Sequence, residues 1–187
     1  KFLRYQRMAE DLGLTEEEVM GNLNFTGAKY GEHIQVTMRN ADGAAWFGNA
    51  PPDLSLISRV RGSNWIYTYL KSFYLDDTRP LGWNNQLFPN VSMPNPLWEL
   101  QGLQHAEFGA PDATGERHVE RLVVTSAGVA SAADFDQVVR DITNFLEYAG
   151  EPAALKRQAI GVWVILFLVL LTFLAYLLKQ EYWTDVH

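Results

Sequence analysis

The strongest constraint on the fold is an apolar run near the C-terminus. Residues 160–178, IGVWVILFLVLLTFLAYLL, contain no charged side chain. As a helix with a rise of about 1.5 Å per residue, this run spans roughly the 30 Å hydrocarbon core of a bilayer. A helix buried in a soluble core normally keeps a polar face, and this run has none. The sequence therefore predicts a transmembrane anchor with a short tail in residues 156–187, behind a water-exposed domain in residues 1–155.

The residues around the apolar run fit a membrane span but specify its direction weakly. Lys156 and Arg157 precede the run, and Lys179 follows it. Basic residues favour the cytoplasmic side, so this count alone places the larger domain weakly on that side. Aromatic residues near both ends suit the two membrane interfaces; they are Trp163, Tyr176, Tyr182 and Trp183.

Charge and residue types exclude several functions. The formal net charge of −7 argues against nucleic acid as a partner, because phosphate binding needs a basic face. The absence of cysteine excludes disulfides, thiolate metal sites and cysteine nucleophiles within these residues. No Walker loop, GxSxG or GxGxxG motif occurs, so phosphoryl transfer, acyl transfer and Rossmann-type binding have no support. The histidines are expected on loops and the tail, without zinc-binding spacings; they are His33, His105, His118 and His187.

The water-exposed part is predicted to be mainly helical. Two helices are expected at the start, separated at Gly13, with Thr15 and Glu18 forming a capping box at the second. A third helix is expected around residues 65–73, after Gly62.

Two further elements are expected in the second half of this part. Apolar residues at three- and four-residue spacing predict an amphipathic helix over residues 131–150, with Ser131 as its N-cap. Before it, two segments separated by APDATGE predict a short irregular β-hairpin. Residues 26–47 give no clear pattern.

The most unusual stretch outside the apolar run is FPNVSMPNPLW, residues 88–98. It places Met93 between Pro89, Pro94 and Pro96, which stiffen the backbone and exclude a helix. Core methionines usually lie on helices, where their flexibility fills gaps. A thioether held on a stiff loop therefore predicts a sulfur directed at a ligand.

Several segments together resemble the cytochrome c1 family in its bacterial form. They are the opening KFLRYQRM, APPDLSLISRVRG at residues 50–62, FPNVSMPNPLW, NFLEYAGEP and the single C-terminal apolar helix. Members of that family are the membrane-bound haem subunits of the quinol:cytochrome c oxidoreductase, the cytochrome bc1 complex. The resemblance implies a mainly α, cytochrome c-like haem domain with a short irregular β-hairpin and one C-terminal transmembrane helix.

The resemblance also implies roles for particular residues. Met93 would be the sixth ligand of the haem iron. Pro51 and Pro52 would pack against the haem face, and Arg61 would pair with a haem propionate, with Arg59 as the competitor for that role. From the residues alone, a turn for the prolines and a surface salt bridge for Arg61 are the alternatives.

The sequence departs from the family pattern at its beginning. The family attaches haem c through Cys-x-x-Cys-His, whose histidine is the proximal iron ligand, and here neither a cysteine nor an early histidine is present. We expect the attachment site and the proximal ligand to lie upstream of Lys1. A relative without haem is the alternative.

By the same resemblance, the protein would be an electron-transfer subunit that carries out no bond chemistry itself. It would accept electrons from a Rieske iron-sulfur protein and reduce a cytochrome c. Its anchor would lie in lipid beside cytochrome b, in the bacterial inner membrane, with the main domain in the periplasm; the resemblance overrides the weak charge count. The alternatives are a non-redox single-span interaction or assembly subunit and the haem subunit of a terminal oxidase.

Overall fold

A computed structural model of the protein divides the chain into two compact units, Lys1–Gly150 and Glu151–His187. The structure describes residues 3–113, 115 and 117–184. His187 and the end of the expected tail therefore lie outside the described residues, as do two residues of the APDATGE segment. The predicted domain boundary between residues 155 and 156 lies just inside the helix of the second unit and stays a prediction.

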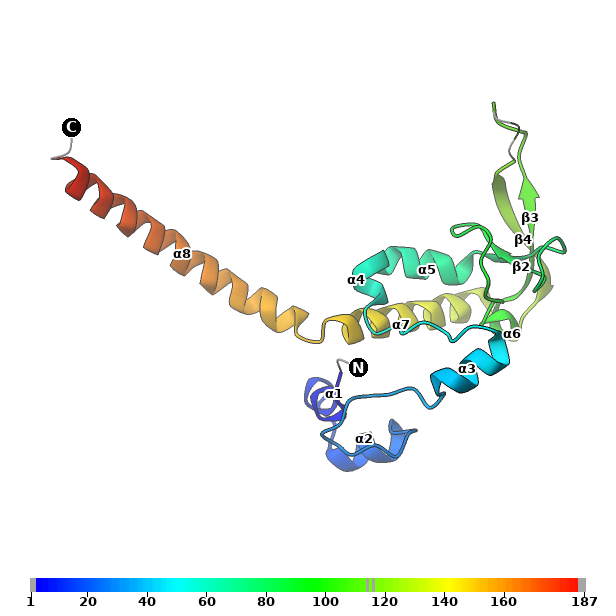
Figure 1. Ribbon diagram of the computed structural model, residues 1–187, viewed down its shortest axis with the longest axis horizontal. Coiled ribbons are helices and arrows are strands. Elements are labelled where there is room, and N and C mark those ends of the chain that lie inside the picture. The colour runs from blue at the N-terminus through cyan, green and yellow to red at the C-terminus, as the bar shows by residue number, and fades with distance from the viewer. Residues whose placement is uncertain (1–2, 114, 116, 185–187) are drawn as a thin grey trace. The chain divides into compact units, whose positions relative to one another are not determined.

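The second unit consists mainly of one long helix, α8 (Ala154–Trp183) (Figure 1). Within it, Lys156–Trp183 is long and apolar enough to cross a membrane, with a mean hydropathy of 2.7 and no buried residues in its most apolar window. Near its start Arg157 pairs with Glu151 at 2.6 Å, and near its end the Lys179 ammonium lies 5.5 Å from the ring centroid of Trp183. The helix fits a single-pass membrane protein, as predicted from the apolar run.

The first unit begins with the two predicted helices, α1 (Tyr5–Leu12) and α2 (Glu16–Asn22). Gly13 ends α1 with a φ of 68°, in the left-handed region where glycine carries little steric penalty. The Thr15 hydroxyl accepts from the backbone N–H of Glu18 at 3.3 Å, and the Thr15 N–H donates to the Glu18 carboxylate at 2.8 Å. The capping box is confirmed.

A small apolar core holds these helices against the end of α7 (Ala132–Gly150). The Tyr148 hydroxyl of α7 also donates to Asp11 of α1 at 2.9 Å. The buried members of this core, joined at its edge by Tyr148 and Ala149, are Leu3, Tyr5, Met8, Ala9 and Val19. The first and last parts of this unit are therefore packed together.

Helix α7 is the scaffold for the middle of the chain. The predicted apolar stripe is buried at Phe135 and Val139, whereas Phe145 is exposed. Helices α4 (Ile57–Arg61) and α5 (Ser63–Lys71) pack on α7, along which α5 runs (Figure 1). Hydroxyls tie α4 and α5 to the second half of α7: Ser58 donates to the Leu146 carbonyl at 3.0 Å, and Ser63 donates to the Glu147 carboxylate at 2.7 Å.

Two elements differ from the expectation for the first half of the chain. A helix, α3 (Asn40–Phe47), forms within the segment that gave no clear pattern. Helix α5 ends at Lys71 and not at Phe73, because Phe73 begins a strand.

The β-structure is larger than the predicted hairpin. Strands β3 (Gly102–Phe108) and β4 (Val119–Ala127) form that hairpin, and two register shifts confirm its irregularity. Two short strands, β1 (Phe73–Leu75) and β2 (Trp83–Asn85), extend it to a four-stranded sheet in the order β2-β1-β3-β4, in which β1 pairs parallel with β3. His105 consequently lies in a strand and not in a loop. The protein is about half helical, with a small sheet.

A close backbone approach joins α6 (Trp98–Gln101) and β3 to the residue after β4. A Cβ added at Gly128 would collide with the Leu100 carbonyl and the Gly102 nitrogen, and one added at Gly102 would collide with the Ser126 carbonyl. These neighbours are backbone atoms, which cannot rotate away as a side chain can. Glycine is therefore required at both positions for steric reasons.

We expect Gly128→Ala to lower the free energy of unfolding by about 1–3 kcal/mol or more, the usual cost of overpacking. Gly21→Ala is the control, because this helical position has open space around it and alanine is favoured over glycine in a helix by roughly 0.5–1 kcal/mol. Denaturant unfolding of the chain in detergent measures both. Equal stability of the two variants would contradict the described approach.

Removal of residues 156–187 is expected to give a fragment that folds without detergent, because the N-terminal core is built from residues up to Ala149. Circular dichroism and gel filtration of the fragment test this. A fragment that pellets with membranes or aggregates would show that the anchor does more than attach the protein.

Candidate functional site

The candidate site is the loop between β2 and α6, which contains Met93. The Met93 side chain is 38% exposed, so its sulfur is not part of a closed core. Buried asparagines lie on both sides of it, Asn85 at the end of β2 and Asn95 two residues beyond the methionine. The loop is thus fixed at both ends with its thioether left accessible, which suits a sulfur that binds something.

A ring cluster brings the segment 50–62 to this loop. The Arg61 guanidinium, at the end of α4, lies 5.0 Å from the ring centroid of Trp65 and 5.7 Å from that of Phe88. The Trp65 and Phe88 rings meet edge to face at 6.2 Å, and Tyr69 stacks on Trp65 at 4.8 Å. Because Phe88 opens the Met93 loop, two segments that were predicted to share a site lie side by side.

The structure favours Arg61 over Arg59 as the cation of this site. A Cβ added at Gly150 would lie 3.5 Å from Cγ of Arg59, so the stem of Arg59 runs toward the end of α7. Within the described part of the chain, no carboxylate lies in ion-pair range of either arginine. Arg61 therefore has charged N–H donors available beside the loop, and the surface salt bridge that was the alternative for Arg61 does not form among the described residues.

Pro51 and Pro52 are exposed and lie before α4. The described polar and ring contacts that join Arg61 to the loop include neither proline. A Cβ added at Gly43 would meet the Pro51 ring at 2.9 Å and the Met38 sulfur at 3.5 Å. A second thioether, Met38, therefore lies near the double proline, which the sequence did not predict.

The segments that carry the candidate residues also expose apolar side chains. A soluble surface usually shows large apolar residues singly, whereas a run of them marks a surface that something covers. Those in residues 50–62 and 86–98 are Leu54, Leu56, Val60, Leu87, Phe88, Met93 and Trp98. An accessible thioether, an arginine beside a ring of the same loop and exposed apolar side chains in both segments fit a flat apolar cofactor with carboxylate groups.

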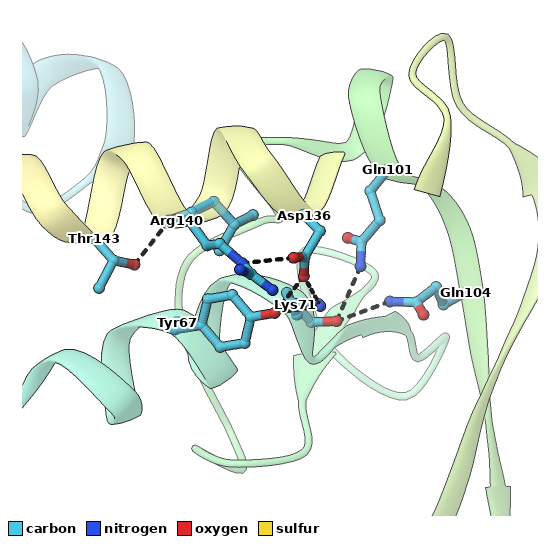
Figure 2. A network of polar contacts seen from close by, with 8 residues as sticks. Tyr67, Lys71, Gln101, Gln104, Asp136, Arg140 and Thr143 are labelled. Atoms are coloured by element: carbon cyan, nitrogen blue, oxygen red, sulfur yellow. Dashed lines mark hydrogen bonds and ion pairs between the residues drawn. The ribbon is translucent and has the colours of Figure 1, made fainter. Parts of the chain in front are cut away.

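A polar network clamps α5 to α7 near this site (Figure 2). Asp136 of α7 accepts from the Lys71 ammonium and the Tyr67 hydroxyl, and pairs with Arg140 at 2.7 Å. The hydrogen bonds from Lys71 and then Tyr67 lower the pKa of Asp136 to about 2. Sequence analysis missed this network, because the i, i+4 spacing of Asp136 and Arg140 is ordinary for a helix surface.

A shallow groove of about 400 Å³ also lies between α5 and α7, lined by polar side chains such as Asn64, Asn144 and Glu147. None of the predicted site residues lines it. Among the described residues, no group of three or more histidine, aspartate and glutamate side chains could hold a metal ion. The Met93 loop therefore remains the candidate site.

Comparison with known proteins gives the family. The profile of the Cytochrome C1 family matches residues 120–186. Cytochrome c1 of Allochromatium vinosum is 51% identical over 188 residues, which cover 100% of this chain and 77% of the relative. The chain belongs to the cytochrome c1 family. Cytochrome c1 of Rhodospirillum rubrum is 30% identical over 83% of this chain and 58% of its own length.

Another relative has a different name. The ammonia monooxygenase gamma subunit of Nitrosomonas europaea is 42% identical over 100% of this chain and 75% of its own length.

The family assignment confirms the resemblance found in the sequence, and with it the cofactor and the general role. Cytochrome c1 binds haem c and transfers electrons in the cytochrome bc1 complex. The absence of cysteine agrees with the expectation that the attachment site is not among these residues. The roles of Met93, Arg61, Pro51 and Pro52 stay predictions.

The Asp136 network predicts a dependence of stability on pH. The pKa of Asp136 in the folded protein, about 2, is below its ordinary value of 3.8, so the folded state holds fewer protons. Its contribution to stability is therefore complete above about pH 4 and is lost as the pH falls toward 2.

We expect Asp136→Asn to reduce the loss of stability between about pH 4 and pH 2, measured by urea unfolding. Asp141→Asn on the same helix is the control, since Asp141 accepts from the Gln137 amide and has no contact with Lys71. If the two variants show the same pH dependence, the network does not act as described.

Proposed function

We propose that this protein is the haem-bearing electron-transfer subunit of a bacterial quinol:cytochrome c oxidoreductase. The observation that carries the proposal is the Met93 loop, which has an accessible thioether between two buried asparagines, with Arg61 beside the Phe88 ring of the same loop. Bound haem c supplies one-electron exchange at its iron. The chain itself makes and breaks no substrate bond; it provides ligand, environment and docking surface.

Met93 is proposed as the sixth ligand of the haem iron. A thioether is a weak, neutral donor that favours the ferrous state, so methionine ligation raises the reduction potential relative to harder ligands. Pro89, Pro94 and Pro96 restrict the loop in the unfolded chain as well as in the folded one. The sulfur can therefore stay in place through each cycle of oxidation and reduction.

Arg61 is proposed to pair with a haem propionate. Its Cζ lies 5.0 Å and 5.7 Å from the ring centroids of Trp65 and Phe88, and its N–H groups are suited to bind a carboxylate in bidentate fashion. Pro51 and Pro52 are proposed to pack against the haem face, which their exposed position permits. Together these residues would form a cytochrome c-like haem domain.

Family membership supports a proposal for the anchor and the partners. We propose that residues 156–187 cross the bacterial inner membrane beside cytochrome b and end in a short cytoplasmic tail, and that residues 1–155 lie in the periplasm. There the domain would take electrons from a Rieske iron-sulfur protein and pass them to a cytochrome c. Residues 1–159 hold 20 acidic and 14 basic side chains, a charge that favours a basic acceptor. The relative named as an ammonia monooxygenase subunit aligns over the same residues, and within the part of the chain that the structure describes no contact favours a second function.

Met93→Leu tests the proposal directly. The variant is expected to retain covalently bound haem, to have a lower midpoint potential and to bind exogenous ligands at the iron, because leucine preserves bulk and removes the sulfur donor. Redox titration and ligand-binding spectra of the haem-loaded protein measure these changes.

Met38→Leu is the matched control, since it removes the thioether that lies near Pro51. We expect its haem spectrum and potential to stay those of the wild type. If Met38→Leu changes the iron ligation and Met93→Leu does not, the assignment of the ligand is wrong.

A further inference from the structure

Buried amides hold the first end of the Met93 loop: the Asn84 oxygen accepts from the Asn90 N–H at 2.9 Å, and Asn85 makes several further contacts. The side-chain oxygen of Asn85 accepts from the backbone N–H groups of Leu87 and Phe88, both at 3.0 Å, and from the Ser72 hydroxyl at 3.1 Å. Its side-chain nitrogen donates to the Tyr69 carbonyl at 2.9 Å. Asn85 therefore shapes the entry into the loop and attaches it to the last turn of α5.

The second end is fixed by two amides in series. Asn95, which is 2% exposed, accepts from the Leu97 N–H at 2.9 Å and donates to the Gln101 side chain at 2.7 Å. Gln101 in turn donates to the Lys71 carbonyl at 2.9 Å (Figure 2). The exit from the loop is therefore attached to the same end of α5 as the entry.

A helix leaves its last carbonyls without partners inside the helix. Here the Tyr69 carbonyl accepts from Asn85 before the loop, and the Lys71 carbonyl accepts from Gln101 after it. Because both carbonyls belong to α5, this helix sets the distance between the two ends of the loop. Met93 lies between the attachments, with Asn95 two residues away. A shift of either attachment would move the sulfur.

We infer that Asn95 and Gln101 are positioning residues that hold the Met93 sulfur at the haem iron, an inference that rests on the proposed role of Met93 as a ligand. Neither of the two would touch the iron. They would act by fixing the ends of the loop, so that water or another ligand does not replace the weakly binding sulfur at the iron.

The chain offers a close control for this inference. Gln104 donates to the same Lys71 carbonyl at 3.1 Å and to the Phe73 carbonyl at 3.0 Å. It lies in β3, and its described hydrogen bonds do not reach the Met93 loop. Gln104→Ala therefore removes a similar buried amide without releasing the loop.

The test compares Asn95→Ala, Gln101→Ala, their double variant and Gln104→Ala in the haem-loaded protein. The readouts are the rate of imidazole binding to the ferric haem and the midpoint potential. We expect roughly tenfold faster imidazole binding and a lower potential in Asn95→Ala and Gln101→Ala, since a buried hydrogen-bond partner is left unsatisfied in each. Because the two amides act in series, the double variant should change little beyond the larger single effect.

Gln104→Ala is expected to lose stability while keeping the wild-type imidazole rate and potential. Equal effects in Gln101→Ala and Gln104→Ala would overturn the inference, since the role would then be general stability. If Asn95→Ala does not fold with haem, the result for Gln101→Ala alone tests the positioning role. Gln101 is only half-buried, so its replacement disturbs the folded protein less.

Met93→Leu distinguishes the positioning role of the amides from the ligand role of Met93. If Met93→Leu changes the iron ligation and the amide variants do not, the positioning role is wrong and the ligand assignment stands. If Met93→Leu leaves the haem unchanged, both are wrong.

Discussion

The structure around the candidate site depends on the hydrogen bonds that the backbone carbonyls at the C-terminal end of α5 accept. Its carbonyls at Tyr69, Lys71 and Ser72 accept from the Asn85 amide, the Gln101 amide and the backbone N–H of Gln86. A buried polar group without a partner costs about 1–3 kcal/mol, and the end of α5 avoids this cost, since Lys71 also accepts from Gln104 and Tyr69 also accepts from Ser72. Since the donors flank the Met93 loop, completing the helix end and shaping the loop are a single structural requirement. The Asp136 network then fixes that helix on α7.

The sequence was informative wherever the determinants are local. Gly13, Thr15 and Glu18 specify a helix end and a capping box within six residues, and the structure contains both. The apolar spacing of α7 and the composition of α8 likewise depend only on neighbours along the chain. The motifs that carry the family resemblance identified the Met93 loop for the same reason, since stiff prolines around a methionine can be recognised without knowing what they face.

What the sequence did not predict depends on distant partners. Strands β1 and β2 have three residues each, too few to show an alternating pattern, and they exist because β3 pairs with β1. Asn84 and Asn85 suggest a turn by composition, and only the approach of α5 makes Asn85 a buried anchor. The sequence likewise did not show that the stem of Arg59 runs toward Gly150 whereas the Arg61 guanidinium lies beside Phe88.

The contacts at the end of α5 join residues that are far apart in the sequence, and this affects the order in which the domain folds. Gln101 and Gln104 reach the Lys71 carbonyl from 30 and 33 residues away, across the loop itself. Contacts that close long segments form late, because the entropy of closure is lost before the contact repays it, whereas helices form locally and early. We therefore expect α5 and α7 to form first and the Met93 loop to become ordered among the last parts of the domain. If Met93 has its proposed role, it would be unavailable to the iron during biogenesis until the sheet is complete.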